Sequence, residues 1–325
     1  MGNADSKAVR AARALLQQAR ELVHPVSVQG SCGIGPRTPH ALRTALSKLD
    51  EAVAVCPNLP EVYVERSIVR ADVGDKDRAR EDAQRAFELR PADAHSYIFI
   101  SFCFPWPERR RILRTAMRRL RGSPSDRVSL WRNLVYSYWY EGRFEEQVRE
   151  AKGLLGYRKR VRYFQRVDLD HSILGSALEA LGQYEEAEQS YRKGLRSRYG
   201  ANLASNVVLA RVRRNDFQGA EAALKTLRIK MPRDLASLLQ ASILGLRGER
   251  ASCSPKTLAK ATEENVFGGV GLYAFYAAVV LLRMGQGANA RELLRRYVAH
   301  IESNPREWGI TNRWEVAKAK ELLAV

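Results

Sequence analysis

Small and apolar residues recur along most of this chain with the period of an α-helix, and turn residues interrupt them at regular distances. Between residues 61 and 91, a first apolar stripe that contains Tyr63 ends at Gly74, and an alanine-rich second stripe ends at Pro91. Alanine lets two helices approach closely, glycine adopts the left-handed turn between them, and proline stops the second helix. This segment is therefore predicted to form two antiparallel helices joined by a short turn.

The same arrangement occurs five times, and the turn residue always follows the first anchor residue by eleven positions. The anchor and turn residues are Tyr63 with Gly74, Trp131 with Gly142, His171 with Gly182, Ala204 with Asn215, and Ala274 with Gly285. Two of the intervals between turns are close to twice a period of about 34 residues. Further helix pairs are therefore expected around Pro105–Pro107, with a turn near Glu108, and around Gly248. The interval before Gly182 exceeds one period, and we expect the extra residues within 156–166.

Two segments come closest to a known repeat signature. The motif W-x-x-L-x-x-x-Y stands at Trp131–Tyr138, and a related pattern runs from Leu174 to Ala187. They resemble the tetratricopeptide repeat family, whose pattern is W-x-x-L-G-x-x-Y followed by small and aromatic positions. Arg66 and Gln147 depart from it, because the family usually has Leu and Ala there. The resemblance implies an all-α fold, an α-solenoid of about eight helical hairpins plus a C-terminal capping helix, or roughly seventeen helices.

We expect three regions along the chain. Residues 1–59 would form a degenerate N-terminal hairpin with an inserted loop at 25–40, residues 60–305 the solenoid, and residues 306–325 the capping helix. A polar-faced cap is expected because the last hairpin of a solenoid would otherwise leave an apolar face open.

The formal net charge of +18 favours an anionic partner: an acidic protein surface, nucleic acid or an anionic membrane. Arginines spread over solvated helix faces are the alternative explanation. No apolar run approaches the ~20 residues needed to cross a bilayer. The four cysteines lie far apart and form no C-x-x-C pair, which is typical of a reducing compartment, so we expect a cytoplasmic protein.

Catalytic and metal-binding patterns are absent from the sequence. The five histidines are dispersed, and His171 occupies a predicted core position. The glycine-rich loop Gly30–Thr38 lacks the lysine and the preceding strand of a phosphate-binding loop. We therefore expect no enzyme activity, no cofactor, no metal and no small-molecule substrate.

Two basic clusters are candidate anion-binding sites, since guanidinium groups bind phosphates and carboxylates with paired donors. The first cluster lies on the second helix of the degenerate hairpin and comprises Arg109, Arg110, Arg111, Arg114, Arg118, Arg119 and Arg121. The second comprises Arg158, Lys159, Arg160, Arg162 and Arg166, interleaved with aromatic residues that either stack on bases or pack between repeats. A solvated helix face is the alternative for the first cluster.

The concave groove that the family resemblance implies would be lined by residues between the core positions of each first helix. These candidates are Arg132, Asn133, Tyr136, Tyr140, Ser172, Ser176, Asn202, Asn206 and Arg213. Their donors, acceptors and aromatic rings suit an extended peptide.

The chain thus resembles a non-enzymatic scaffold or adaptor that binds a partner protein or peptide in its groove, assisted by its basic clusters. An RNA-associated helical-repeat protein is one alternative. Another is a membrane-tethered adaptor, because Gly2 followed by Ser6 and Lys7 fits the pattern for N-myristoylation in a eukaryote.

Overall fold

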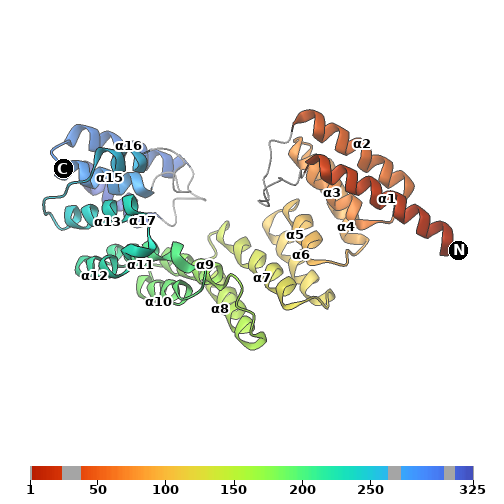
Figure 1. Ribbon diagram of the computed structural model, residues 1–325, viewed down its shortest axis with the longest axis horizontal. Coiled ribbons are helices and arrows are strands. Elements are labelled where there is room, and N and C mark those ends of the chain that lie inside the picture. Colours follow the sequence, from red (N-terminus) through yellow and green to blue (C-terminus); the bar gives the residue numbers. More distant parts are fainter. Residues whose placement is uncertain (1, 24–37, 263–271, 304–311, 325) are drawn as a thin grey trace. The chain divides into compact units, whose positions relative to one another are not determined.

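The structure is a computed structural model that describes residues 2–23, 38–262, 272–303 and 312–324 (Figure 1). These residues form seventeen α-helices, two short 3₁₀ segments and no strand, so the predicted all-α solenoid is confirmed. The helices of the N-terminal half are α1 (Gly2–Val23), α2 (Pro39–Val55), α3 (Pro60–Asp72), α4 (Lys76–Glu88), α5 (Ala94–Phe102), α6 (Trp106–Arg119), α7 (Pro124–Trp139) and α8 (Phe144–Val161). Those that follow are α9 (Val167–Ala180), α10 (Tyr184–Leu195), η1 (Gly200–Leu203), α11 (Ala204–Arg213), α12 (Phe217–Leu227), η2 (Arg228–Lys230), α13 (Arg233–Leu246), α14 (Pro255–Thr262), α15 (Leu272–Arg283), α16 (Gly287–Ser303) and α17 (Arg313–Ala324).

The predicted turn residues are the ones that reverse the chain between paired helices. Five glycines and one asparagine have φ between +61° and +88°, the left-handed region that favours these residue types. They are Gly74, Gly142, Gly182, Asn215, Gly248 and Gly285. The turn of the degenerate hairpin comes slightly earlier than expected: Pro105 precedes the first residue of α6, and Glu108 already lies inside that helix.

The extra residues before Gly182 lengthen α8 and form an added turn. Helix α8 has 18 residues and ends at Val161, and the next residue, Arg162, has a φ of +53° that stops the helix. A second left-handed residue, Arg166, directly precedes α9. The predicted insertion in residues 156–166 is therefore partly helix and partly a tight turn.

The described chain separates into two compact units, residues 1–137 and 138–325. In unit 1, α1, α2 and α3 share one core, to which Leu16, Leu49, Leu59 and Val62 contribute. Packing is thus continuous across residue 59, where the sequence placed a boundary. Most of the predicted loop at 25–40 lies outside the described residues. No described helix is both long and apolar enough to span a bilayer.

Arg66 shows how unit 1 accommodates a departure from the family pattern. Its guanidinium binds both carboxylate oxygens of Asp82, at 2.9 and 2.7 Å, and also Asp50 at 2.7 Å. Arg70 reaches the same Asp82 at 2.8 Å. An ion-pair cluster thus joins α2, α3 and α4 where the family usually has a leucine.

Candidate interaction surfaces

Arg110, which the sequence placed on the exposed side of α6, is buried, with 7% of its surface exposed. Its guanidinium donates a hydrogen bond to the Ser137 carbonyl at 3.4 Å. This corrects the prediction of Arg110 as an anion-binding residue, because the arginine at this position packs inward with the apolar stripe.

Most other arginines of this cluster also interact with other groups of the chain. Arg109 stacks on the rings of Trp106 and Phe102, at 4.0 and 4.9 Å from the centroids, and donates to the Ser101 and Phe102 carbonyls. Arg111 pairs with Glu108 at 2.8 Å. Further internal contacts are made by Arg114, by Arg118 with Thr115, and by Arg119 with the Phe87 ring. Arg121 is exposed.

Arg158 organises the added turn between α8 and α9. Only 1% of its surface is exposed, and it forms an ion pair with the fully buried Asp170. It also donates to the carbonyls of Tyr163 and Gln165, at 3.1 and 2.8 Å. Arg158 therefore holds this turn together and cannot meet an external anion, which corrects the sequence-based assignment for this residue.

The remaining members of the second cluster lie at the surface. Lys159, Arg160, Arg162 and Arg166 are exposed, although Arg166 pairs with Asp168 at 3.4 Å. The aromatic residues between these cations differ in their exposure. The Tyr163 ring lies against the Arg158 guanidinium, whereas Phe164 is 58% exposed.

The predicted groove residues are distributed over both units. Arg132, Asn133 and Tyr136 belong to unit 1, and the other six belong to unit 2. Tyr136, Tyr140 and Asn202 are exposed; Arg132, Asn133, Ser172, Ser176 and Asn206 are half-buried; and Arg213 is buried. Of this set, the structure brings Ser176 and Arg213 into one hydrogen-bonded network.

That network is buried beneath α17. Arg213 of α11 binds Glu179 of α9 at 2.6 Å and Glu315 of α17 at 2.9 Å. Glu315 also accepts a hydrogen bond from Tyr276 of α15 at 2.9 Å. On the other side, Tyr191 donates to Glu179 at 2.9 Å and lies 3.3 Å from the Ser176 hydroxyl.

Two carboxylates share one guanidinium at this position. Burial raises the pKa of Glu179, while Arg213 acts in the opposite direction. Burial alone would lower the pKa of Arg213. The attraction of Glu179 and Glu315 is larger than this effect and holds the pKa of Arg213 well above its usual value. The predicted capping helix thus contacts α15 and α16 and also reaches α11, so Arg213 is engaged by its own chain. Glu179 was missed from the sequence, although a glutamate between Leu178 and Ala180 in a core stripe is the signal that could have identified it.

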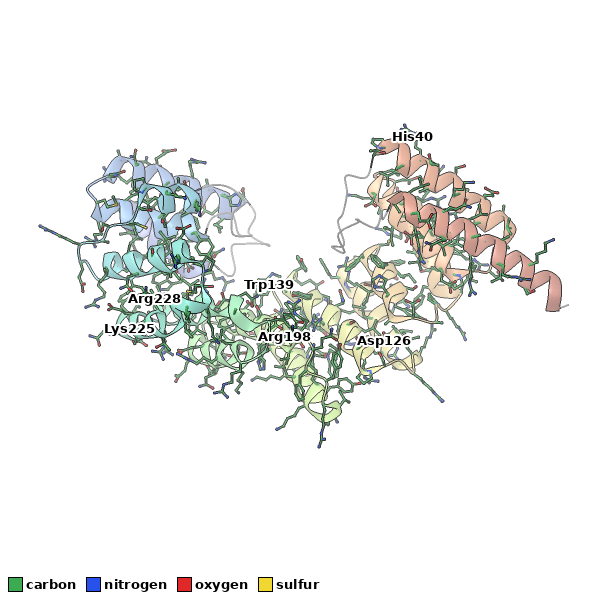
Figure 2. All side chains as sticks on the ribbon, viewed as in Figure 1. His40, Asp126, Trp139, Arg198, Lys225 and Arg228 are labelled. Carbon is green, nitrogen blue, oxygen red and sulfur yellow. The ribbon has the colours of Figure 1, made fainter. Side chains whose placement is uncertain are left out.

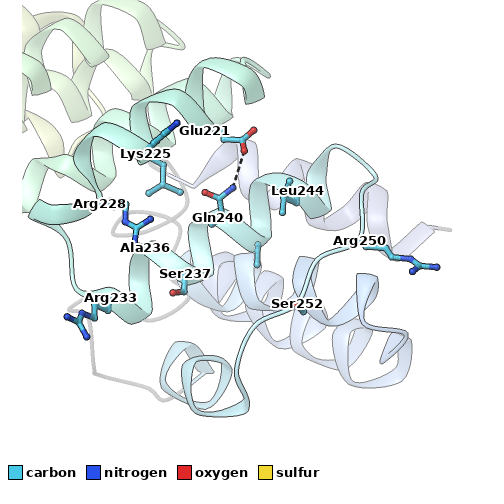
Figure 3. Close-up of a pocket in the computed structure, with 12 residues that line it drawn as sticks. Glu221, Lys225, Arg228, Arg233, Ala236, Ser237, Gln240, Leu244, Arg250 and Ser252 are labelled. Carbon is cyan, nitrogen blue, oxygen red and sulfur yellow. Dashed lines mark hydrogen bonds between the residues drawn. The ribbon is translucent and has the colours of Figure 1, made fainter.

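A surface groove with very different electrostatics lies between α12 and α13 (Figure 3). We call it the α12–α13 groove; its volume is about 770 Å³. Its lining residues are Glu221, Leu224, Lys225, Arg228, Arg233, Ala236, Ser237, Gln240, Ala241, Leu244, Arg250 and Ser252.

Four of these lining residues are cations: Lys225, Arg228, Arg233 and Arg250. Among the residues that the structure describes, none of the four has an ion-pair partner. Lys225 and Arg228 lie along the α12 side (Figures 2 and 3), while Arg233 and Arg250 mark opposite ends of the groove (Figure 3). One carboxylate also lines the groove, and it already accepts hydrogen bonds from other side chains.

That carboxylate is Glu221, which accepts hydrogen bonds from Gln240 at 3.3 Å and Arg247 at 3.1 Å. The neighbouring Ile229, between two cations in η2, is 89% exposed. The sequence reasoning missed these cations because they are scattered over more than twenty positions; the short run Arg228-Ile229-Lys230 was the available signal.

A second groove in unit 2 has α9 as its floor, between α8 and α10, with a volume of about 1200 Å³. We call it the α8–α10 groove. His171 lies in its floor, with Nδ1 3.2 Å from the Ser190 hydroxyl. Because that hydroxyl donates to the His171 carbonyl, Nδ1 must carry the hydrogen. Burial, and then Lys193 and Arg158, lower the pKa of His171 to about 4, so the ring is neutral at pH 7.

A family model described as tetratricopeptide repeat matches residues 172–199, which include most of α9 and all of α10. The chain thus contains a tetratricopeptide repeat, which supports the resemblance drawn from its sequence. No curated protein sequence matches it significantly.

Several solved structures are partly similar to this chain. One is PilF of Pseudomonas aeruginosa, with 15% identity, 73% of this chain and 96% of that chain covered, and a TM-score of 0.44. Another is part of a tetratricopeptide-repeat protein from Cytophaga hutchinsonii, with 13% identity, 97% and 93% coverage, and a TM-score of 0.43. The apo form of RapI has 11% identity, 87% and 93% coverage, and a TM-score of 0.43. Similarity at this level says nothing about the function of the present chain.

Proposed function

We propose that this protein is a scaffold that holds a partner polypeptide by an acidic segment in the α12–α13 groove. The observation that carries the proposal is the set of four cations around this groove that have no ion-pair partner among the described residues. Cations that the chain does not neutralise itself are available to carboxylates of a partner, and arginine binds carboxylates with two donors.

The dimensions of the groove favour an extended segment. Helix α13 has 14 residues, so it is ~21 Å long at ~1.5 Å per residue. About six or seven residues of extended polypeptide span that length at ~3.3 Å each. Ser237, Gln240 and Ser252 supply side-chain hydrogen-bonding groups for a main chain lying between them.

The chemistry of the lining favours polypeptide over RNA. Single-stranded nucleic acid is held by stacking of its bases on aromatic side chains as well as by cations. None of the residues assigned to this groove is aromatic. The scaffold proposal requires no chemical step, and tetratricopeptide-repeat proteins are typically non-enzymatic scaffolds.

The test is a binding titration with a fluorescent pool of peptides about seven residues long, each rich in glutamate and serine. We expect Lys225→Glu with Arg228→Glu to weaken binding by at least about tenfold, which corresponds to ~1.4 kcal/mol. Ser237→Trp fills the groove without changing its charge and should weaken binding similarly, whereas Ser237→Ala should not.

The matched control reverses two charges elsewhere, Arg118→Glu with Arg121→Glu. Equal loss in this control would show that net charge alone attracts the peptides and would overturn the proposal, as would failure of the whole pool to bind. An oligouridylate of similar length that binds more tightly than every peptide would support the RNA-associated alternative.

The concave-groove site remains a proposal for the predicted residues other than Ser176 and Arg213. The membrane tether also remains a proposal. In α1, Leu16 and Val23 are buried in the core of unit 1, while Lys7, Arg10 and Arg13 are exposed and could face anionic lipid. Intact mass and vesicle flotation of the native chain against Gly2→Ala test it; an unmodified Gly2 rejects it.

A further inference from the structure

The α8–α10 groove is a second surface with unneutralised positive charge. Six cations line it: Lys152, Arg158, Lys159, Lys193, Arg196 and Arg198, of which Arg158 is held by Asp170. Glu186 is the one carboxylate assigned to the lining. Among the described residues, Lys152, Lys159, Lys193 and Arg196 have no ion-pair partner.

Unlike the α12–α13 groove, this one has an apolar floor. Leu174 and Leu178 lie at its bottom, and Leu155 and Val167 are half-buried. Phe164, more than half exposed, also lines it. A contiguous apolar surface within a polar rim is characteristic of a protein interaction site, and here Phe164, Leu155 and Val167 together contribute it.

The lining residues repeat along each helix with the spacing of a coiled-coil seam. On α9 they are Val167, His171, Leu174 and Leu178, separated by four, three and four positions. On α10 Glu186, Ser190 and Lys193 have the first two of these spacings, as do Lys152, Gly156 and Lys159 on α8; the lining also includes Gln189, Leu155 and Arg158, which lie beside these stripes. The largely apolar stripe of α9 can receive the apolar face of another helix, and the polar stripes of α8 and α10 lie on its two sides.

Gly156 supplies an independent observation. It lies within α8, where glycine is less favourable than alanine, yet a Cβ added there would meet no atom within 4 Å. Other helical glycines nearby are explained by packing: at Gly175 an added Cβ would lie 2.3 Å from the Tyr191 ring, and at Gly194 2.5 Å from Leu203. The open space at Gly156 has no such occupant within the chain and allows the close approach of another backbone.

We propose that the α8–α10 groove binds an amphipathic α-helix of a partner protein, whose apolar stripe covers the floor and whose flanking acidic residues meet the rim lysines and arginines. Helix α10 has 12 residues, so a helix of three to four turns, ~18 Å long, matches the groove. This ligand differs in conformation from the extended segment proposed for the α12–α13 groove. The protein would then hold two partner elements at once.

The test uses a hydrocarbon-stapled peptide of about fourteen residues with leucines at i, i+3, i+7 and i+10 and glutamates on both flanks. A stapled peptide of the same composition, with its leucines spread around the helix, is the control ligand. We expect the amphipathic peptide to bind at least about tenfold more tightly than the control peptide.

Gly156→Trp places a bulky side chain in the open space and should abolish binding, while Gly156→Ala, which adds one methyl group, should weaken it less. Phe164→Ser should weaken binding by about tenfold or more. Lys225→Glu with Arg228→Glu, in the other groove, should leave it unchanged. Equal binding of the two peptides, or full binding by Gly156→Trp, overturns the proposal. An oligouridylate that competes with the peptide and is released by Phe164→Ser would assign the groove to nucleic acid instead.

Discussion

Helix α6 in unit 1 and the α12–α13 groove in unit 2 both contain several cations, but they differ in whether these cations interact with other groups of the chain. In α6, Arg109 lies against Trp106 and Phe102, and Arg110 is buried. In the groove, Lys225 and Arg228 have no ion-pair partner among the described residues. The arginines of α6 are closer together in the sequence, yet more of them interact with other groups of the chain.

The difference arises from the neighbours of each cation. Aromatic rings and carbonyls of α4 and α5 surround the α6 arginines, so guanidinium groups there stabilise packing between helices. The α12–α13 groove offers its cations neither rings nor a free carboxylate, since Glu221 is held by Gln240 and Arg247. The number of arginines therefore identifies a binding surface less well than the absence of internal partners does.

The largest expected effect is that of reversing the charge of Arg110. A carboxylate in its place would be buried opposite the Ser137 carbonyl, and an uncompensated buried charge costs about 3–5 kcal/mol. Urea unfolding of Arg110→Glu should show this loss, whereas the exposed Arg121→Glu should stay within ~0.5 kcal/mol of the native protein. Similar stability of the two variants would remove the distinction between internal and surface arginines in this cluster.

A smaller loss is expected when the stacked arginine of α6 is truncated. Arg109→Ala removes two cation–π contacts and two hydrogen bonds to carbonyls, for which we expect about 2 kcal/mol in total. Arg109→Lys, which keeps the charge but not the planar group, should recover only part of it. Full recovery by lysine in thermal unfolding would mean that charge alone matters at this position.

Burial and, after it, the cations Lys193 and Arg158 lower the pKa of His171, and this effect should be measurable. Its pKa of about 4 in the folded protein lies below that of unfolded histidine, ~6.5, so the unfolded chain binds a proton first as the pH falls. The contribution of the neutral His171 to the free energy of unfolding should be fully present above pH ~6.5. It should decrease towards pH ~4 by about 1 kcal/mol, a figure that allows for the partial exposure of the ring.

His171→Asn keeps a donor towards Ser190 and should remove this part of the pH dependence. Lys193→Gln should raise the His171 pKa in an NMR titration, because Lys193 is one of the cations that lower it. A titration midpoint near 6.5 in the native protein would contradict both expectations.

The smallest effect on stability is expected in the α12–α13 groove itself. Lys225→Ala with Arg228→Ala removes no ion pair that the structure describes, so the free energy of unfolding should change by no more than ~0.5 kcal/mol. A loss above about 2 kcal/mol would show that these cations are structural, like those of α6, and that the comparison between the two regions fails.

The helices and turns could be predicted because their signals are local. Gly74 and Asn215 mark turns in the sequence and adopt the left-handed conformation in the structure. The candidate sites were harder because burial depends on which face of a helix meets its neighbours. Arg110 and Arg158 differ little in the sequence from the exposed arginines beside them, and only the position of Asp170 after a tight turn explains why Arg158 is buried.

The grooves could not be predicted for a related reason. Lys225 and Arg250 are far apart in the chain, and the turns of α12, η2 and α13 decide whether they border the same surface. The ion pair between α17 and α11 could not be predicted either. The apolar pattern of α17 indicates that the helix packs against the chain, but it does not indicate which cation Glu315 binds.

The contact of Arg213 with Glu315 joins residues 102 positions apart in the chain. In a simple repeat array each hairpin touches only its neighbours, so its ends can fray independently and its stability is close to a sum over repeats. Here opening α17 would remove Glu315 from Arg213 and from Tyr276, and Arg213 lies two hairpins before the last paired helices, α15 and α16. Unit 2 should therefore exchange its amide hydrogens from α11 to α17 as one cooperative block, more like a globular domain than a row of separable repeats.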